Sequence, residues 1–244
     1  MTAPLAHEAG VVWHELECGS YAVDLPLWEE LAEMTTGPIL DLGCGTGRVA
    51  LHLARRGRDV HGLDRDPGLL PTLKRRAAGL SVEAIEADAG AFALDTRFRL
   101  ALAPMQLIQL FPGPDERLAC LQCVADHLAP NGRAAFAIVE SMPAPVDAPP
   151  PLPDAREVGG WVYSSLPIET IVDAEQIRVR RLRQVVSPAG ELSEALDEVV
   201  LSRLGAAALE AEAKEAGLKA AERRPIPATE AHVGSTAVLF EREA

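Results

Sequence analysis

Aromatic residues are scarce in this chain: Phe, Trp and Tyr make up 4% of its 244 residues. The core must therefore be built mainly from Ala, Leu and Val. Long uninterrupted apolar runs and a charged-then-apolar leader are both missing, which argues against a membrane span and a signal peptide. The four cysteines show no disulfide framework of the secreted type, so we expect a reducing, cytoplasmic location. They are Cys18, Cys44, Cys120 and Cys123.

Positive charge is also in deficit. Lys and Arg number 23 against 36 Asp and Glu, so the formal net charge is -13. Such a charge repels phosphate backbones and anionic lipid surfaces, and we expect neither nucleic acid nor membrane as a partner. The chain has ample apolar content, at 48%, to bury a sizeable core. Its length allows one large domain or two small ones.

Short apolar runs alternate with amphipathic stretches over the first 140 or so residues, a pattern typical of β-α-β units around a parallel sheet. The predicted strands are residues 38–42, 59–64, 81–88, 98–104 and 133–140. The predicted helices are residues 21–35, 46–57, 67–78 and 115–129.

The pattern changes after residue 140. Six prolines in residues 141–153 exclude a helix interior or a central strand and predict an extended linker. Three segments with partial period-two alternation follow, and they predict an antiparallel insert: residues 161–173, 176–187 and 191–204. A helix over residues 207–217 and two last strands, 219–225 and 237–243, complete the predicted elements.

The most informative stretch is Ile39–Arg48, ILDLGCGTGR, which joins a predicted strand to a predicted helix. Glycines there let the backbone turn sharply and let a ligand approach closely, while the helix start favours an anionic group. A dinucleotide prefers G-x-G-x-x-G, but here the sixth position is Arg48 and the third glycine comes one residue early. This departure disfavours an NAD(P)-dependent oxidoreductase, which stays an alternative.

Charged residues stand where a different ligand, S-adenosylmethionine, needs them. Asp41 precedes the loop and can attract a cationic amino group, and Arg48 can pair with a carboxylate. Asp64, at the end of the second strand, can accept both ribose hydroxyls. Asp88, followed by Ala89 at the end of the third strand, can accept the exocyclic amine of adenine. Such strand ends share the edge of an open sheet where ligands bind.

These residues lie in motifs that resemble the class I S-adenosylmethionine-dependent methyltransferases. The matching segments, over roughly residues 36–140, are ILDLGCGTGRVALHLARRG, VHGLDRDPGLL, IEADAGAF and HLAPNGRAAFAIV. The resemblance implies a Rossmann-like α/β fold: a seven-stranded, mostly parallel sheet with an antiparallel last strand and helices on both faces. It implies cofactor contacts by Tyr21, Asp41, Gly43, Cys44, Gly45, Arg48, Asp64, Arg65, Asp88, Ala89 and Pro104. One departure is Phe98-Arg99, where the family usually has Phe-Asp.

We therefore predict a single domain, residues 1–244, that methylates a small-molecule acceptor as a monomer or homodimer. Its predicted parts are an N-terminal helical cap (1–36), a cofactor-binding core (37–140), a linker and β insert that cover the acceptor site (141–204), and a last helix with two strands (205–244). A non-catalytic S-adenosylmethionine sensor or carrier is the other alternative. No metal site is predicted.

The sequence identifies no catalytic residue. Methyl transfer from a sulfonium requires mainly positioning and the exclusion of water, and a base only where the acceptor must lose a proton. The candidate bases are His14, Glu140, Tyr163 and His232. The Cys120-x-x-Cys123 pair is predicted to pack in the core, since it lies in mid-helix. The arginines between residues 178 and 183 are predicted to form a solvated face, with an anionic acceptor as the alternative.

Overall fold

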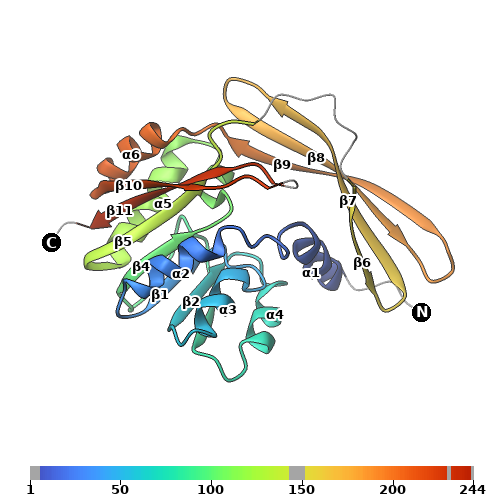
Figure 1. Ribbon diagram of the computed structural model, residues 1–244, viewed down its shortest axis with the longest axis horizontal. Coiled ribbons are helices and arrows are strands. Elements are labelled where there is room, and N and C mark those ends of the chain that lie inside the picture. The colour runs from blue at the N-terminus through green and yellow to red at the C-terminus, as the bar shows by residue number, and fades with distance from the viewer. Residues whose placement is uncertain (1–5, 143–151, 230–231, 243–244) are drawn as a thin grey trace.

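The chain folds around two β-sheets, with the helix α1 (Ala6–Glu17) lying between them (Figure 1). The computed structural model describes residues 6–142, 152–229 and 232–242. Most of the proline-rich linker predicted over 141–153 lies outside these residues. Within the described part of the chain, no helix combines the length and apolarity needed to cross a membrane.

The larger sheet has seven strands in the order β10-β11-β5-β4-β1-β2-β3. Only β11 runs opposite to the other six strands, so the predicted fold class is confirmed. Its strands are β1 (Ile39–Leu42), β2 (Val60–Asp64), β3 (Val82–Glu86), β4 (Phe98–Ala103), β5 (Leu128–Ile138), β10 (Leu218–Ile226) and β11 (Ser235–Arg242). The strand predicted from residue 133 starts at Leu128, because pairing with β4 begins before an irregularity at Asn131, where φ is 58°.

Helices cover both faces of this sheet, and alternate strand residues pack under each set. The helices are α2 (Leu25–Glu33), α3 (Arg48–Ala54), α4 (Leu70–Arg76), α5 (Pro114–His127), α6 (Ala206–Glu215) and the 3-10 helix η1 (Leu107–Leu110). Leu40 of β1 packs in the cluster beneath α5 and α6, whereas its neighbour Ile39 packs with α2, α3 and α4. Burying each such side chain contributes ~1.5–3 kcal/mol.

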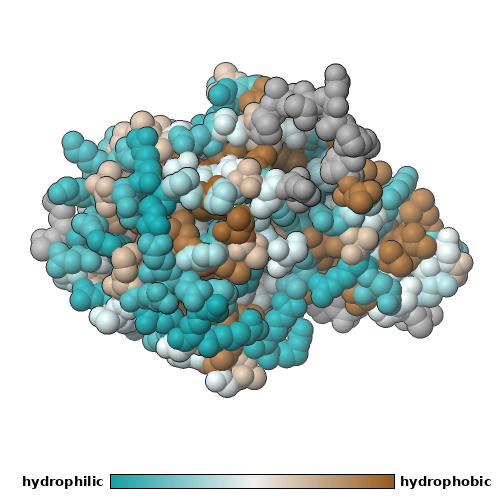
Figure 2. Space-filling view, viewed as in Figure 1, coloured by the Kyte–Doolittle hydropathy of each residue, from teal (hydrophilic) through white to brown (hydrophobic). Residues whose placement is uncertain are grey.

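The smaller sheet is the predicted antiparallel insert, with the order β6-β7-β8-β9. Its strands are β6 (Asp154–Val158), β7 (Trp161–Val172), β8 (Gln176–Val186) and β9 (Leu192–Ser202). The strand β6 was not predicted, because its five residues are all exposed and show no alternation. Apolar side chains remain exposed on this sheet, among them Leu192 and Leu196, and hydrophobic groups gather over it on the right of Figure 2.

The helix α1 was not predicted within the N-terminal cap, and it packs on the insert. Trp13 lies edge-on to Tyr163 of β7, with ring centroids 5.2 Å apart. Glu17 pairs with Arg183 of β8 at 2.7 Å. Arg183 is therefore turned toward α1. The other arginines of β8 are partly confirmed as a solvated face, since Arg178 and Arg180 pair with exposed acids.

Gln109 of η1 joins the core to the insert. Its side-chain amide donates to the carbonyls of Val139 (3.1 Å) and Ser202 (3.0 Å), and its Oε1 accepts from the Val139 N–H at 2.7 Å. The Ser202 hydroxyl donates back to the Gln109 carbonyl. Because Gln109 is fully buried, none of these groups has water as an alternative partner.

We expect Gln109→Ala to lower the free energy of unfolding by about 3 kcal/mol, since it leaves three buried backbone groups unpaired at ~1–3 kcal/mol each, partly relieved by relaxation. Gln184→Ala is the matched control, because its amide donates to the exposed Glu194. Its loss should stay within about 0.5 kcal/mol. Urea titrations of both variants would measure the difference, and equal stabilities would contradict the role given to Gln109.

Candidate functional site

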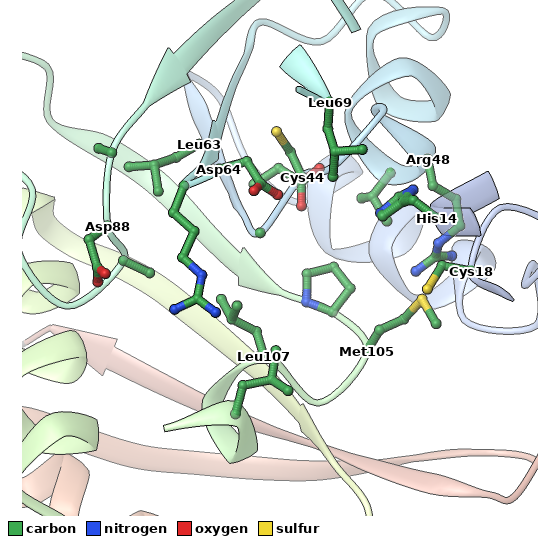
Figure 3. A pocket seen from close by; sticks show the side chains of 18 of the residues that line it. His14, Cys18, Cys44, Arg48, Leu63, Asp64, Leu69, Asp88, Met105 and Leu107 are labelled. Atoms are coloured by element: carbon green, nitrogen blue, oxygen red, sulfur yellow. The ribbon is translucent and has the colours of Figure 1, made fainter. Parts of the chain in front are cut away.

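A cavity of about 310 Å³ opens at the carboxyl ends of β1, β2, β3 and β4 (Figure 3). This edge includes the boundary between β1 and β4, where the strand order reverses and open α/β sheets bind ligands. The predicted residues that line it are Asp41, Gly43, Cys44, Arg48, Asp64, Arg65, Asp88, Ala89 and Pro104. Tyr21 and Gly45 were also predicted to contact a cofactor, but they do not line the cavity.

Asp64 lines the cavity and also shapes the glycine loop, which is the turn from Gly43 to Gly47 between β1 and α3. Its Oδ2 accepts the N–H of Gly45 at 2.7 Å, and its Oδ1 accepts the N–H of Asp66 at 2.9 Å. Gly45 has a φ of +54°, and a Cβ there would lie 2.2 Å from Nε2 of His14. The loop therefore requires glycine at this position both for its backbone conformation and for space.

Asp41 is buried beneath the loop, with 1% of its surface exposed. Its Oδ2 accepts the N–H of Ala50 at 3.0 Å, whereas its Oδ1 has no partner. Burial raises the pKa of Asp41 to about 7, although the nearby Arg48 and the Ala50 hydrogen bond favour the charged form. An unpaired buried carboxylate oxygen at a cavity wall is suited to a cationic ligand group.

Arg48 already has a protein carboxylate as its partner. Its Nη1 and Nη2 donate to the two oxygens of Asp24 at 2.5 and 2.8 Å, and Nη1 also donates to the Tyr21 carbonyl. Trp28 holds Asp24 from the other side, with Nε1 donating at 2.7 Å. The Tyr21 ring lies 5.2 Å from the guanidinium and 4.8 Å from the His232 ring. Tyr21 thus contacts the guanidinium of Arg48 without lining the cavity.

The two ends of the cavity differ in chemistry. Asp88 lies at one end in Figure 3, opposite His14, Arg48 and Cys18. The Asp88 Oδ1 accepts the N–H of Gly90 at 2.7 Å, which fixes the carboxylate. The cavity also has apolar lining residues that were not predicted: Val49, Leu63, Leu69, Ala87, Met105, Leu107, Leu110 and Phe111. Such an apolar wall is suited to the flat face of a nucleobase.

Among the four candidate bases, only His14 lines the cavity. Glu140 accepts from the Ala206 N–H at 2.8 Å, at the start of α6, and from the Thr236 hydroxyl. Tyr163 packs on Trp13, and His232 packs on Tyr21. These partners come from distant parts of the chain, so no local sequence pattern separates the four candidates.

The described residues supply neither a reactive thiol nor a metal site at the cavity. Cys120 is buried in the core, as predicted. Burial raises the pKa of the lining thiols Cys18 and Cys44, which keeps both protonated. No group of three or more potential metal-binding side chains occurs among the residues that the structure describes.

The insert contributes no lining residue in its described part. Its contact with the site runs through α1, which supplies His14, while Cys18 follows the last residue of this helix, one turn after His14. The spacing of Val12 and Leu16, both buried, is the sequence signal that would have predicted this helix.

Comparisons with known protein sequences match part of this chain. Residues 39–132 match the family model for a methyltransferase domain. A cypemycin N-terminal methyltransferase from a Streptomyces species is 33% identical over 96 residues, which cover 39% of each chain. In three curated relatives that match, the aligned segments span 39%, 48% and 31% of the relative's length.

Solved structures match over nearly the whole chain. An amino pentose methyltransferase from Micromonospora echinaspora, solved with S-adenosylmethionine bound, superposes with a TM-score of 0.71 at 19% identity, over 99% of this chain and 100% of that one. A sugar N-methyltransferase from a Streptoalloteichus species gives a TM-score of 0.77 at 16% identity, covering 100% of this chain and 96% of that one. At these identities the likeness concerns the fold.

Proposed function

Starting from the chain's membership of the class I S-adenosylmethionine-dependent methyltransferases, we propose that it transfers the methyl group of S-adenosylmethionine to an amino group of a small molecule. One observation carries the proposal. Three carboxylates that stand on or just after three separate strands, Asp41, Asp64 and Asp88, meet one cavity beside a glycine loop. No other part of the described chain combines these groups.

The residues at the cavity fit the cofactor. The unpaired Oδ1 of Asp41 would accept from its ammonium group, and Asp64 has lone pairs left for the ribose hydroxyls. Asp88 and the apolar wall would hold adenine. When bound, S-adenosylmethionine supplies a methyl group already activated by a positive sulfur, so the chain need not activate the donor.

Two lines of support concern the acceptor: the first favours an amino group in a small molecule, and the second concerns where the acceptor side lies. By their names, two of the relatives above are an amino pentose methyltransferase and a sugar N-methyltransferase, and the third is a cypemycin N-terminal methyltransferase. The insert is the second line, since it holds α1 over the cavity through Glu17 and Tyr163. We propose that residues 141–204 shape the acceptor side through this contact.

The chain's own part in catalysis is to bind, orient and exclude water. The apolar wall formed by Leu107, Leu110 and Phe111 limits the access of water to the cavity. A free amine has a lone pair and attacks the methyl carbon without a base at the moment of bond formation. The carbon–sulfur bond breaks as the carbon–nitrogen bond forms, and the proton then leaves the methylated amine to solvent.

Incubation with isotopically labelled S-adenosylmethionine tests the function directly. We expect label in amino sugars, including their nucleotide-linked forms, and none in the matching sugars with a hydroxyl in place of the amine. S-adenosylhomocysteine at 100 times its Kd should stabilise the chain by about 2.7 kcal/mol, which raises Tm by roughly 5–10 °C. NAD should give no shift. Stabilisation without transfer to any amine would indicate a sensor or carrier, and a shift with NAD alone would indicate an oxidoreductase.

A further inference from the structure

The imidazole of His14 is the one titratable side chain that α1 places at the cavity wall. It lies at the end opposite Asp88, beside Arg48 and Cys18 (Figure 3). Its Nδ1 is buried and has no hydrogen-bond partner among the described residues. Its Nε2 lies against the backbone of Gly45, where the absence of a side chain leaves room for the ring.

The unpaired nitrogen indicates which tautomer is present. A proton on Nδ1 would leave a buried N–H without an acceptor, which is rarer in proteins than an unsatisfied acceptor. A proton on Nε2 instead places the donor at the glycine loop, beside the cavity that His14 lines. His14 in this tautomer presents one N–H to a ligand that lies on the loop.

Burial, more than the surrounding charges, keeps the ring neutral. Burial lowers the pKa of His14, and Arg48 acts in the same direction, whereas Glu15, Asp64 and Asp66 raise it. A neutral donor is suited to this end of the site, because the cofactor brings two positive charges, its ammonium and its sulfonium. A second cation beside Arg48 would oppose both of them.

The helix α1, which carries the ring, is held in place from two sides. Glu15, the next residue, pairs with Arg76 of α4 at 2.8 Å and accepts from the Thr46 hydroxyl of the glycine loop. Glu17 is tied to Arg183 of the insert. Two separate parts of the molecule thus fix α1, so the position of His14 does not depend on its own hydrogen bonds.

We propose that His14 is a cofactor-binding residue whose Nε2 donates a hydrogen bond to the carboxylate of S-adenosylmethionine. This inference rests on the proposed function. The nucleoside belongs at the end formed by Asp64 and Asp88, so the amino acid part lies at the end formed by the loop, His14 and Arg48. The ammonium has an acceptor there in Asp41, and the carboxylate needs donors. Arg48 is largely occupied by Asp24, and the Nε2 of His14, which lies at the glycine loop, supplies a further donor.

Two ligands separate this role from a structural one: S-adenosylhomocysteine, and its analogue in which hydrogen replaces the carboxyl group. We expect His14→Ala to weaken S-adenosylhomocysteine at least tenfold by calorimetry and to change the affinity for the analogue less than twofold. His14→Gln keeps an N–H donor and should recover part of the loss. His52→Ala, a histidine of α3 that pairs with Glu29 away from the cavity, is the control and should bind both ligands normally.

Equal losses for both ligands in His14→Ala, or an unchanged affinity for S-adenosylhomocysteine, would overturn the assignment. Should His14→Ala fail to fold, the same comparison is made with His14→Gln, for which a loss confined to S-adenosylhomocysteine supports the contact and a loss shared by both ligands refutes it. Failure of the wild-type chain to bind S-adenosylhomocysteine would instead refute the proposed function, so the two failures are distinct.

Discussion

Asp64→Ala should weaken the binding of S-adenosylhomocysteine at least tenfold, a loss of ~1.4 kcal/mol or more. The carboxylate is proposed to accept the ribose hydroxyls, and it also accepts the N–H groups of Gly45 and Asp66. Its removal therefore takes away a ligand contact and releases the loop that forms the floor of the cavity. Calorimetry of the variant beside the wild type measures the effect.

Asp66→Ala is the matched control for this experiment. Asp66 is an exposed acid two residues away, its carboxylate accepts only the N–H of Gly68 among the contacts described, and it does not line the cavity. The control removes the same charge from the same loop, so general electrostatic effects on a cationic ligand appear in both variants. Equal affinities in Asp64→Ala and the wild type would remove Asp64 from the site.

Asp41→Asn should abolish most of the pH dependence of ligand binding. With its pKa raised to about 7, Asp41 is roughly one-tenth ionised at pH 6 and nine-tenths ionised at pH 8. Only the ionised form pairs with the ligand ammonium. The affinity of the wild type for S-adenosylhomocysteine should therefore rise about tenfold between these pH values, whereas that of Asp41→Asn should stay low and nearly constant.

The stability of the free protein should respond in the opposite sense. The folded pKa of Asp41 lies above the unfolded value of 3.8, so the native state binds more protons between about pH 4 and pH 7. The stability contributed by the protonated carboxyl is complete at low pH and is lost as pH rises through 7. The wild type minus Asp41→Asn difference in unfolding free energy should therefore fall over this range, by a few kcal/mol at most.

Urea titrations at pH 5, 6, 7 and 8 measure this difference, and groups common to both proteins cancel from it. A difference that does not change with pH would mean that Asp41 has an ordinary pKa in the folded chain. Binding that is equally pH-dependent in Asp41→Asn would assign the titration to another group, of which His14 is the nearest candidate at the cavity.

Much of the fold and half of the site could be predicted because they depend on local patterns. A strand that is buried on both faces reads as a continuous apolar run, so β1, β2 and β4 were found within one or two residues of their observed bounds. By contrast, β6 has no buried residue and α1 was not predicted at all. Both are stabilised by contact with each other and with β7.

The sequence by itself determined the glycine loop and the acids at the strand ends. Each of these stands a fixed number of residues from a strand, and parallel strands bring their carboxyl ends to one edge. Only the tertiary structure decided the partner of Arg48, which is Asp24, and the helix-capping role of Glu140. Only it placed His14 on Gly45. These contacts join segments far apart in the chain. The packing of whole elements against one another decides which side chains meet, and no local sequence pattern encodes that packing.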